Sequence, residues 1–105
     1  MVKDNILVEW ELATCSSKML ENYKAPYTAT CMKNLIAEWA LMIWQTNMDE
    51  FAMGWSTETS YYWKTLNPHW KNRIPWWSSW GSAVSVAVWM AVAALGTETW
   101  GSVRQ

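Results

Sequence analysis

The chain has 105 residues, a formal net charge of −1, eleven tryptophans and two cysteines. This length fits one small domain, or one membrane helix with a modest extramembrane part. Cys15 and Cys31 are too few for a disulfide scaffold, and sixteen residues is no metal-ligand spacing. Because a large basic surface is missing from the composition, we expect no nucleic-acid partner.

The charges are segregated along the sequence. Residues 1–62 carry four lysines against eight acidic residues, a net charge of −4, whereas residues 63–73 carry three basic residues and no acid. This basic cluster directly precedes an apolar run. The positive-inside rule therefore predicts that a membrane-spanning run would have its N-terminal side in the cytoplasm.

Residues 4–23 are expected to form a first helix. Asp4 can cap its start, and apolar side chains recur near helical spacing along it. The pattern is mixed, because the apolar residues at positions 8, 10 and 12 also alternate as in a strand. Pro26 ends whichever element precedes it.

Residues 31–47 are expected to form an amphipathic helix. Thr28 or Thr30 can cap its start, and polar residues fall between its apolar positions. We leave open whether its apolar face lies on a membrane, docks on a partner or packs on the first helix. The predicted docking face consists of Leu35, Ile36, Trp39, Met42 and Ile43.

Residues 49–72 show no regular periodicity. Turn-forming residues alternate with tryptophans and tyrosines along this stretch, which is typical of a loop in the headgroup region of a membrane. Pro75 then stands where a first helical residue belongs, since its missing N–H costs nothing there.

The strongest signal is a run of 24 uncharged residues, from Ile74 to Thr97. At ~1.5 Å per residue, a helix of this length would cross a hydrocarbon core of about 30 Å. We therefore expect one transmembrane helix over residues 75–97. Small residues at four-residue intervals would pack against a partner's transmembrane helix. This predicted interface consists of Ser79, Ala83, Ala87 and Ala91.

Both ends of the predicted transmembrane helix carry residues suited to a membrane interface. Tryptophan rings favour the headgroup level, and basic residues favour the cytoplasmic side. The expected anchors are Trp76, Trp77, Trp80, Trp100, Lys71 and Arg73.

The sequence shows no motif that indicates catalysis. His69 is the only histidine, so a histidine metal site or a Ser-His-Asp triad would rest on one residue. Phosphate-binding glycine loops, zinc-ligand spacings and GxSxG do not occur. We therefore expect no catalytic residue, no metal and no cofactor, and we leave open a contact with lipid or pigment.

The order of landmarks from residue 63 onward resembles the α-type light-harvesting polypeptides of purple bacteria. These landmarks are Trp63-Lys64-Thr65-Leu66-Asn67-Pro68, the helix from Pro75, and Leu95-Gly96-Thr97-Glu98-Thr99-Trp100. The resemblance implies a single membrane helix in a photosynthetic complex. The family's pigment-ligating histidine has no counterpart, because Trp89 stands nearest and an indole N–H offers no lone pair to a metal.

Together these patterns predict an all-α protein in three parts. Residues 1–72 form a cytoplasmic or interfacial helical region, residues 73–98 the transmembrane helix and residues 99–105 a short tail. The predicted function is a non-catalytic accessory subunit of a larger, energy-converting membrane complex (photosynthetic, respiratory or membrane oxygenase). Its expected partners are integral membrane subunits and the lipid bilayer. The alternatives are a soluble helical interaction domain with residues 83–96 as its core helix, and a free-standing small membrane-active protein.

Overall fold

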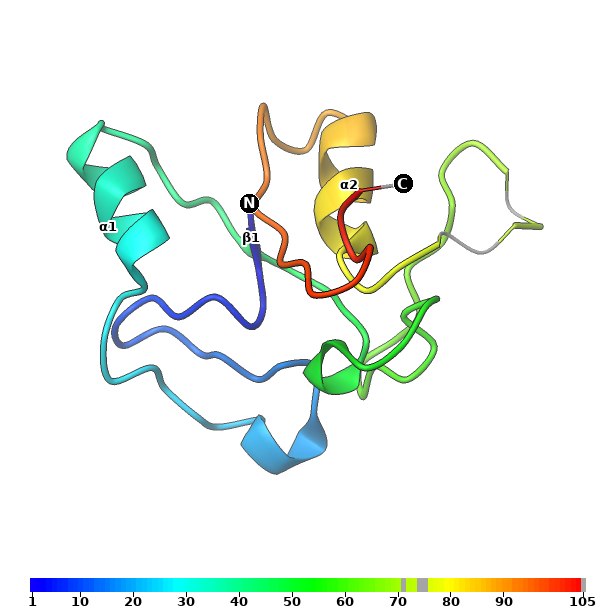
Figure 1. Ribbon diagram of the computed structural model, residues 1–105, viewed down its shortest axis with the longest axis horizontal. Helices are drawn as coiled ribbons and strands as arrows, with labels where there is room; N and C mark the ends of the chain where they lie inside the picture. Colours follow the sequence, from blue (N-terminus) through cyan, green and yellow to red (C-terminus); the bar gives the residue numbers. More distant parts are fainter. Residues whose placement is uncertain (71, 74–75, 105) are drawn as a thin grey trace.

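The computed structural model describes residues 1–70, 72–73 and 76–104. Within them lie two α-helices, α1 (Thr30–Ala37) and α2 (Trp80–Ala87), and two short strands, β1 (Val2–Lys3) and β2 (Gln45–Thr46). Two 3-10 helices, η1 (Lys18–Leu20) and η2 (Glu50–Ala52), interrupt long irregular segments. In Figure 1, α1 lies to the left of β1 and α2 to its right.

β1 is the central strand of a small parallel arrangement. Val2 pairs with Gln45 of β2 on one side and forms a parallel bridge with Leu95 on the other. The backbone amides alternate between the two sides: Val2 N donates to Trp44 O and Lys3 N donates to Leu95 O, each at 3.0 Å. Three segments that are far apart in the sequence therefore meet at the N-terminal strand.

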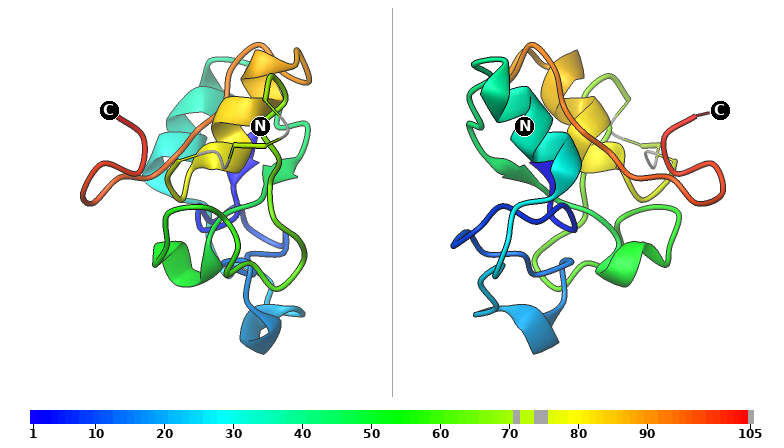
Figure 2. Two further views of the ribbon diagram at one scale, coloured as in Figure 1. Left: turned by 90° about the vertical axis from the view of Figure 1, so that its right-hand side faces the viewer. Right: turned by 60° about the vertical axis from the view of Figure 1, so that its left-hand side comes forward.

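The two α-helices stand in the two crossovers of this arrangement. Parallel strands need a long connection, and residues 4–44 carry α1 while residues 47–94 carry α2. The buried core comprises Val2, Ile6 and Met32, and partly buried apolar residues pack against it. Figure 2 shows α1 and α2 packed beside the strands while the loops of residues 8–27 and 50–70 extend away from them.

α2 docks on the strands through serine side chains. The hydroxyls of Ser82 and Thr46 lie 2.7 Å apart, and Ser82 Oγ donates to Leu95 O at 2.7 Å. Ser85 Oγ donates to Ser82 O at 2.8 Å, and both serines are buried. The face of α2 that meets the sheet is therefore polar and fully hydrogen-bonded at these two positions.

The predicted all-α fold is wrong for the first two elements. Residues 4–23 hold only η1, and the Asp4 carboxylate accepts bonds from the amides of Thr14 and Ser16 instead of capping a helix. The helix predicted over residues 31–47 ends at Ala37, after which the chain runs on to β2. The apolar residues Trp39, Met42 and Ile43, which continue the helical spacing, lie in the connection between α1 and β2.

The predicted transmembrane helix is wrong as well. α2 has eight residues, and the backbone turns at Trp89 before returning to β1 at Leu95. Across residues 1–70, 72–73 and 76–104, no helix is long and apolar enough to cross a membrane. The helix start predicted at Pro75 lies outside the described residues.

Candidate active site

The centre of the site is Lys3, which β1 places in the interior. Its side chain is fully buried. Lys3 Nζ donates to Ser79 Oγ at 2.8 Å, to Ser78 Oγ at 2.9 Å and, at 3.4 Å, to the carbonyl oxygen of Thr97. An ammonium group has three donors, so each of them has a partner.

The surroundings of Lys3 favour the neutral amine. Burial lowers the pKa of Lys3 from its ordinary 10.5 to about 8, and the negative charge of Asp49 only partly opposes this effect. A lysine with such a pKa is half deprotonated at about pH 8, so a fraction of the molecules carries the neutral amine near neutral pH. It can then accept a proton from a hydroxyl group, which is the function of a general base.

Ser79 holds the lysine in place. Its hydroxyl donates to Thr97 O at 2.9 Å and accepts from Thr97 N at 3.3 Å as well as from Lys3. Because a hydroxyl has a single proton, the proton of Ser79 is directed to the carbonyl and away from the amine. Asn5 Nδ2 donates to Thr97 Oγ1 at 2.9 Å, so the hydrogen-bond network of Thr97 also includes Asn5.

Ser78 and Ser79 reach Lys3 because they form the turn that leads into α2. Ser79 is the residue before the first turn of the helix, and α2 itself is fixed to the strands by Ser82. Ser78 is fully buried. The contact between Lys3 and this turn therefore depends on the attachment of α2 to the strands through Ser82.

A cavity of about 230 Å³ adjoins the lysine and serine cluster. Ser79, Ser82 and Ser102 line it, whereas Ser78 and Lys3 do not. The indole rings of Trp76, Trp77 and Trp80 form much of its wall. A small polar substrate group in this cavity would lie beside serine hydroxyls.

Two of the three cavity serines already direct their protons elsewhere. Ser79 donates to Thr97 O, and Ser82 donates to Leu95 O. Ser102, which is half-buried, is the remaining hydroxyl of the cavity wall. Ser79 therefore positions Lys3, whereas Ser102 has a hydroxyl that can react.

A second, larger cavity of about 550 Å³ lies on the other side of β1. Asp4, Thr14 and Thr46 line its polar part, and Met42 and Trp63 line its apolar part. The Asp4 carboxylate is already occupied by Thr14 and Ser16. Lys3 and the serines of the site do not line this cavity, so we place the candidate chemistry in the smaller one.

The described residues hold no group of three or more metal-ligating side chains. Cys15 and Cys31 are both free. Burial raises the pKa of the Cys15 thiol, and the nearby Asp4 adds to this effect. Cys15 is therefore a poor candidate for a nucleophile.

The structure does not place the predicted small-residue interface on one helix face. Ser79 precedes α2 and Ala91 follows it, and both are buried inside the molecule. Ala83 and Ala87 lie on α2 and are exposed. The serines at positions 82 and 85 form the packed face instead.

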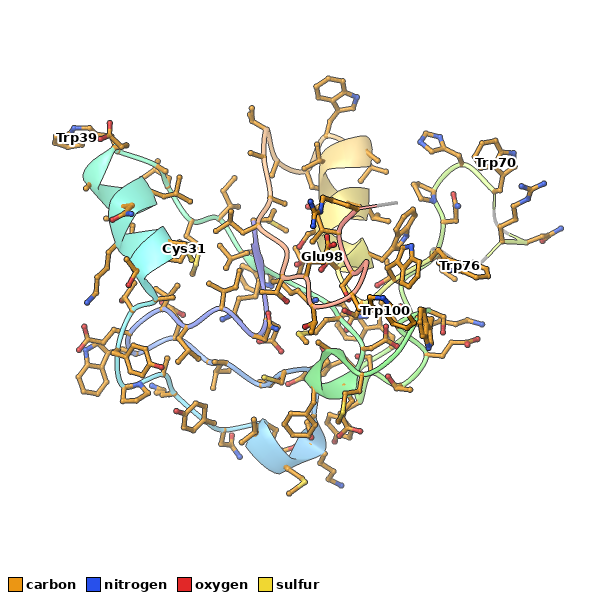
Figure 3. The ribbon with its side chains drawn as sticks, in the orientation of Figure 1. Cys31, Trp39, Trp70, Trp76, Glu98 and Trp100 are labelled. Atoms are coloured by element: carbon orange, nitrogen blue, oxygen red, sulfur yellow. The ribbon has the colours of Figure 1, made fainter. Side chains whose placement is uncertain are left out.

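Three of the predicted membrane anchors, Trp76, Trp77 and Trp100, lie close to one another and not at two ends of a helix. The rings of Trp77 and Trp100 both contact Trp55, with centroids 4.8 and 6.1 Å apart, and Trp76 lies 6.5 Å from Trp77. Figure 3 shows Trp76 and Trp100 near the start of α2. Trp80 begins α2, and Arg73 lies over the ring of Trp70. Lys71 lies outside the described residues.

The predicted docking face is divided between solvent and core. Met42 packs against the core, whereas the other four side chains are exposed. These exposed residues are Leu35, Ile36, Trp39 and Ile43. Docking of another surface onto them stays a prediction.

Sequence reasoning missed Lys3, Ser78, Ser79 and Ser102 as candidates for chemistry. The one available signal was the serine-rich stretch from residue 78 to 85, which interrupts an apolar run. In a membrane-helix interpretation these serines only weaken the hydropathy of the helix. A lysine on a two-residue strand has no periodicity that could have revealed its burial.

The amidase family matches residues 1–105, and the chain belongs to this family. The chain is 55% identical to the A subunit of a glutamyl-tRNA(Gln) amidotransferase from Nitratiruptor sp., covering 99% of the chain and 24% of that protein. It is 56% identical to the corresponding A subunit of Helicobacter pylori, over 100% of the chain and 23% of that protein. The chain thus spans about a quarter of the length of these relatives.

Solved structures agree with this assignment. The glutamyl-tRNA(Gln) amidotransferase A subunit of Thermotoga maritima superposes with a TM-score of 0.94 at 47% identity, over 99% of the chain and 23% of that structure. A structure described as revealing the evolutionary origins of an s-triazine catabolic enzyme gives a TM-score of 0.89 at 34% identity, over 96% of the chain and 22% of that structure. The fold is therefore a mixed α/β part of the amidase fold.

These findings correct the functional predictions from the sequence. The resemblance to light-harvesting polypeptides is wrong, since the whole chain matches the amidase family. The prediction of a non-catalytic accessory subunit is wrong, because the relatives are amidotransferase subunits. The predicted integral membrane partners and single-pass membrane location are wrong too, since they rested on a transmembrane helix that is not found among the described residues.

Proposed function

We propose that this chain carries the serine–lysine centre of an amidase that cleaves a carboxamide by acyl transfer. The observation that carries the proposal is the buried Lys3 amine, with a pKa of about 8, within hydrogen-bond distance of two serine hydroxyls beside a cavity. Serine–lysine pairs are a known variant of the Ser-His-Asp arrangement.

In the proposed reaction Ser102 supplies the attacking hydroxyl. The O–H bond of Ser102 breaks as its Oγ forms a bond to the carbonyl carbon of the amide, and the proton passes by way of Ser78 to neutral Lys3. The carbon–nitrogen bond then breaks, and the departing nitrogen takes the proton from Lys3 and leaves as ammonia. Water attacks the acyl ester that remains on Ser102, and the acid is released.

The names of the relatives suggest where the released nitrogen goes. They are A subunits of glutamyl-tRNA(Gln) amidotransferases. We therefore propose that the ammonia is passed on to a separate centre of the amidotransferase, which acts on glutamyl-tRNA, and is not simply lost to solvent. The identity of 47–56% over nearly the whole chain supports this assignment.

Ammonia release from a primary carboxamide such as glutamine tests the catalytic roles in the full protein. Ser102→Ala and Lys3→Met should each lower kcat by about 1,000-fold or more, because nucleophile and base act as one unit. Ser56→Ala, which removes a hydroxyl bonded only to Glu58 and its backbone, serves as the matched control and should keep full activity. Full activity of Ser102→Ala would refute the proposed nucleophile.

A further inference from the structure

Tryptophan occupies an unusual backbone conformation at four positions of this chain. Nine non-glycine residues of the described chain have positive φ, and four of them are Trp10 (φ 70°), Trp39 (63°), Trp77 (93°) and Trp89 (61°). A bulky residue in this region is an outlier, since Cβ meets the following carbonyl oxygen. The chain has only four glycines, roughly half of the usual share of about 7%.

Trp39 stands at the position after the end of α1 where glycine is the usual residue. Trp39 N donates to Ile36 O and Ala40 N donates to Leu35 O, each at 3.0 Å. These two bonds define a Schellman motif with position 39 in the left-handed conformation. The side chain of Trp39 is 92% exposed and points away from the molecule (Figure 3), so packing does not explain it.

Trp89 repeats this arrangement at the end of α2. Trp89 N donates to Val86 O at 3.1 Å and Met90 N donates to Ser85 O at 2.8 Å. Its side chain is 90% exposed. Both α-helices of the described chain therefore end in a glycine-type motif that contains tryptophan.

Trp10 occupies a tight turn that also requires a positive φ. Glu11 N donates to Val8 O at 3.0 Å, which closes a four-residue turn with Trp10 in its third position. A positive φ at this position is the mark of a type II turn, for which glycine is the common residue. The indole is again mostly exposed.

Trp77 brings the same feature into the candidate active site. It directly precedes Ser78, has a φ of 93° and lines the cavity beside Ser79 and Ser102. Its indole N–H is buried, and no hydrogen-bond partner for it is found in the described chain. A buried donor without a partner is costly, which is a second sign that an indole fits this place poorly.

We infer that positions 10, 39, 77 and 89 are glycine positions of this backbone, and that residue 77 controls access to the cavity beside Lys3. Glycine at these positions removes the conflict between Cβ and the left-handed backbone. At position 77 it also removes an indole ring from the cavity wall. The statement about access rests on the proposed function, whereas the statement about the backbone does not.

A single cause can place tryptophan at several glycine positions at once. The codon UGA is translated as tryptophan in some genetic codes and as glycine in another. If the gene has UGA at these positions, the protein made in its own cells carries glycine there, while a tryptophan-reading translation yields the present sequence. This explanation also accounts for the high number of tryptophans beside the few glycines.

Thermal unfolding of the full protein tests the glycine positions without any activity. Trp39→Gly and Trp89→Gly should each raise Tm by about 1–3 °C over Trp39→Ala and Trp89→Ala, because alanine keeps the Cβ conflict. Trp44 is the matched control, since it is 72% exposed but has no positive φ, and there alanine should be the more stable replacement. Equal stability of glycine and alanine at positions 39 and 89 would overturn the inference.

Two further measurements address the cavity and the cause. Trp77→Gly should release ammonia from glutamine at least 10-fold faster than the protein with Trp77, and Trp77→Ala should fall between them. If the glycine variants gain stability while Trp77→Gly stays inactive, the proposed function fails and the glycine positions stand. Peptide masses from the source cells should show glycine at the four positions, and tryptophan in those peptides would refute the decoding explanation.

Discussion

At the scale of single residues, Lys3 connects the stability of the fold with its proposed chemistry. The lysine is buried without an ion pair in the described chain, and its three donors bond only to neutral oxygens. Such a group is stable as the neutral amine and costly as the ammonium ion. The same burial that prepares a general base therefore destabilises the folded state at low pH.

The pH dependence of stability should show this cost. Between about pH 8 and 10.5 the unfolded chain holds the Lys3 proton while the folded chain has lost it, so the free energy of unfolding rises with pH across this window. Relative to Lys3→Met, the unmodified protein should gain about 2–3 kcal/mol between pH 7 and pH 11. Urea unfolding of both proteins along this pH range measures the difference. A difference that does not change with pH would show that Lys3 is not desolvated.

At the scale of elements, the serine face of α2 determines how the site is assembled. Ser82 joins the helix to Thr46 of β2 and to the carbonyl of Leu95. Ser82 and Thr46 are buried, and Leu95 is partly buried. The turn of Ser78 and Ser79 is continuous with this helix. The position of the helix on the strands therefore fixes the position of the two hydroxyls on Lys3.

Removing the Ser82 hydroxyl should loosen this attachment. In Ser82→Ala the partly buried Leu95 carbonyl loses its side-chain donor and the buried Thr46 Oγ1 loses its partner, which costs about 1–3 kcal/mol. Ala83→Ser places a hydroxyl on the neighbouring exposed position and should change stability by less than about 0.5 kcal/mol. Chemical denaturation of both variants measures the two effects. Equal stability of Ser82→Ala and the unmodified protein would contradict the role of this hydroxyl.

The elements also show how much the sequence can predict. The start of the helix near residue 30 was found, because Met32, Leu35 and Ile36 have helical spacing there. Its end was not, since Trp39 gives no signal of the left-handed turn that glycine would have given. The apolar run to Thr97 was misread because a helix followed by a returning buried strand has the same hydropathy as one long membrane helix.

At the scale of the whole molecule, the site joins three distant segments. Lys3, the Ser78–Ser79 turn and Thr97 are brought together only by the two parallel crossovers. No local motif encodes such a contact, which is why the sequence alone predicted no chemistry. The match to amidases over almost the whole chain identifies the family and the fold, which the periodicity of the sequence does not reveal.

The described chain also exposes a connected apolar segment at the edge of its sheet. Leu41, Ile43 and Trp44 lead into β2 and are 89%, 62% and 72% exposed. In the described chain β2 pairs only with β1, so its outer edge can add another strand. An exposed apolar segment on an open strand edge is typical of an interaction surface or an association site.

We therefore expect these 105 residues, when produced on their own, to self-associate in solution through the β2 edge. Ile43→Lys places a charge on that edge and should lower the association constant by about 10-fold or more, since burying an ammonium group against apolar side chains is costly. Val92→Lys is the matched control, because Val92 is 97% exposed but lies outside this segment. Sedimentation velocity at several concentrations measures both. Equal loss of association in the two variants would mean that added charge in general, and not the β2 edge, governs the association. A monomeric parent chain would show that the loops around the edge protect it.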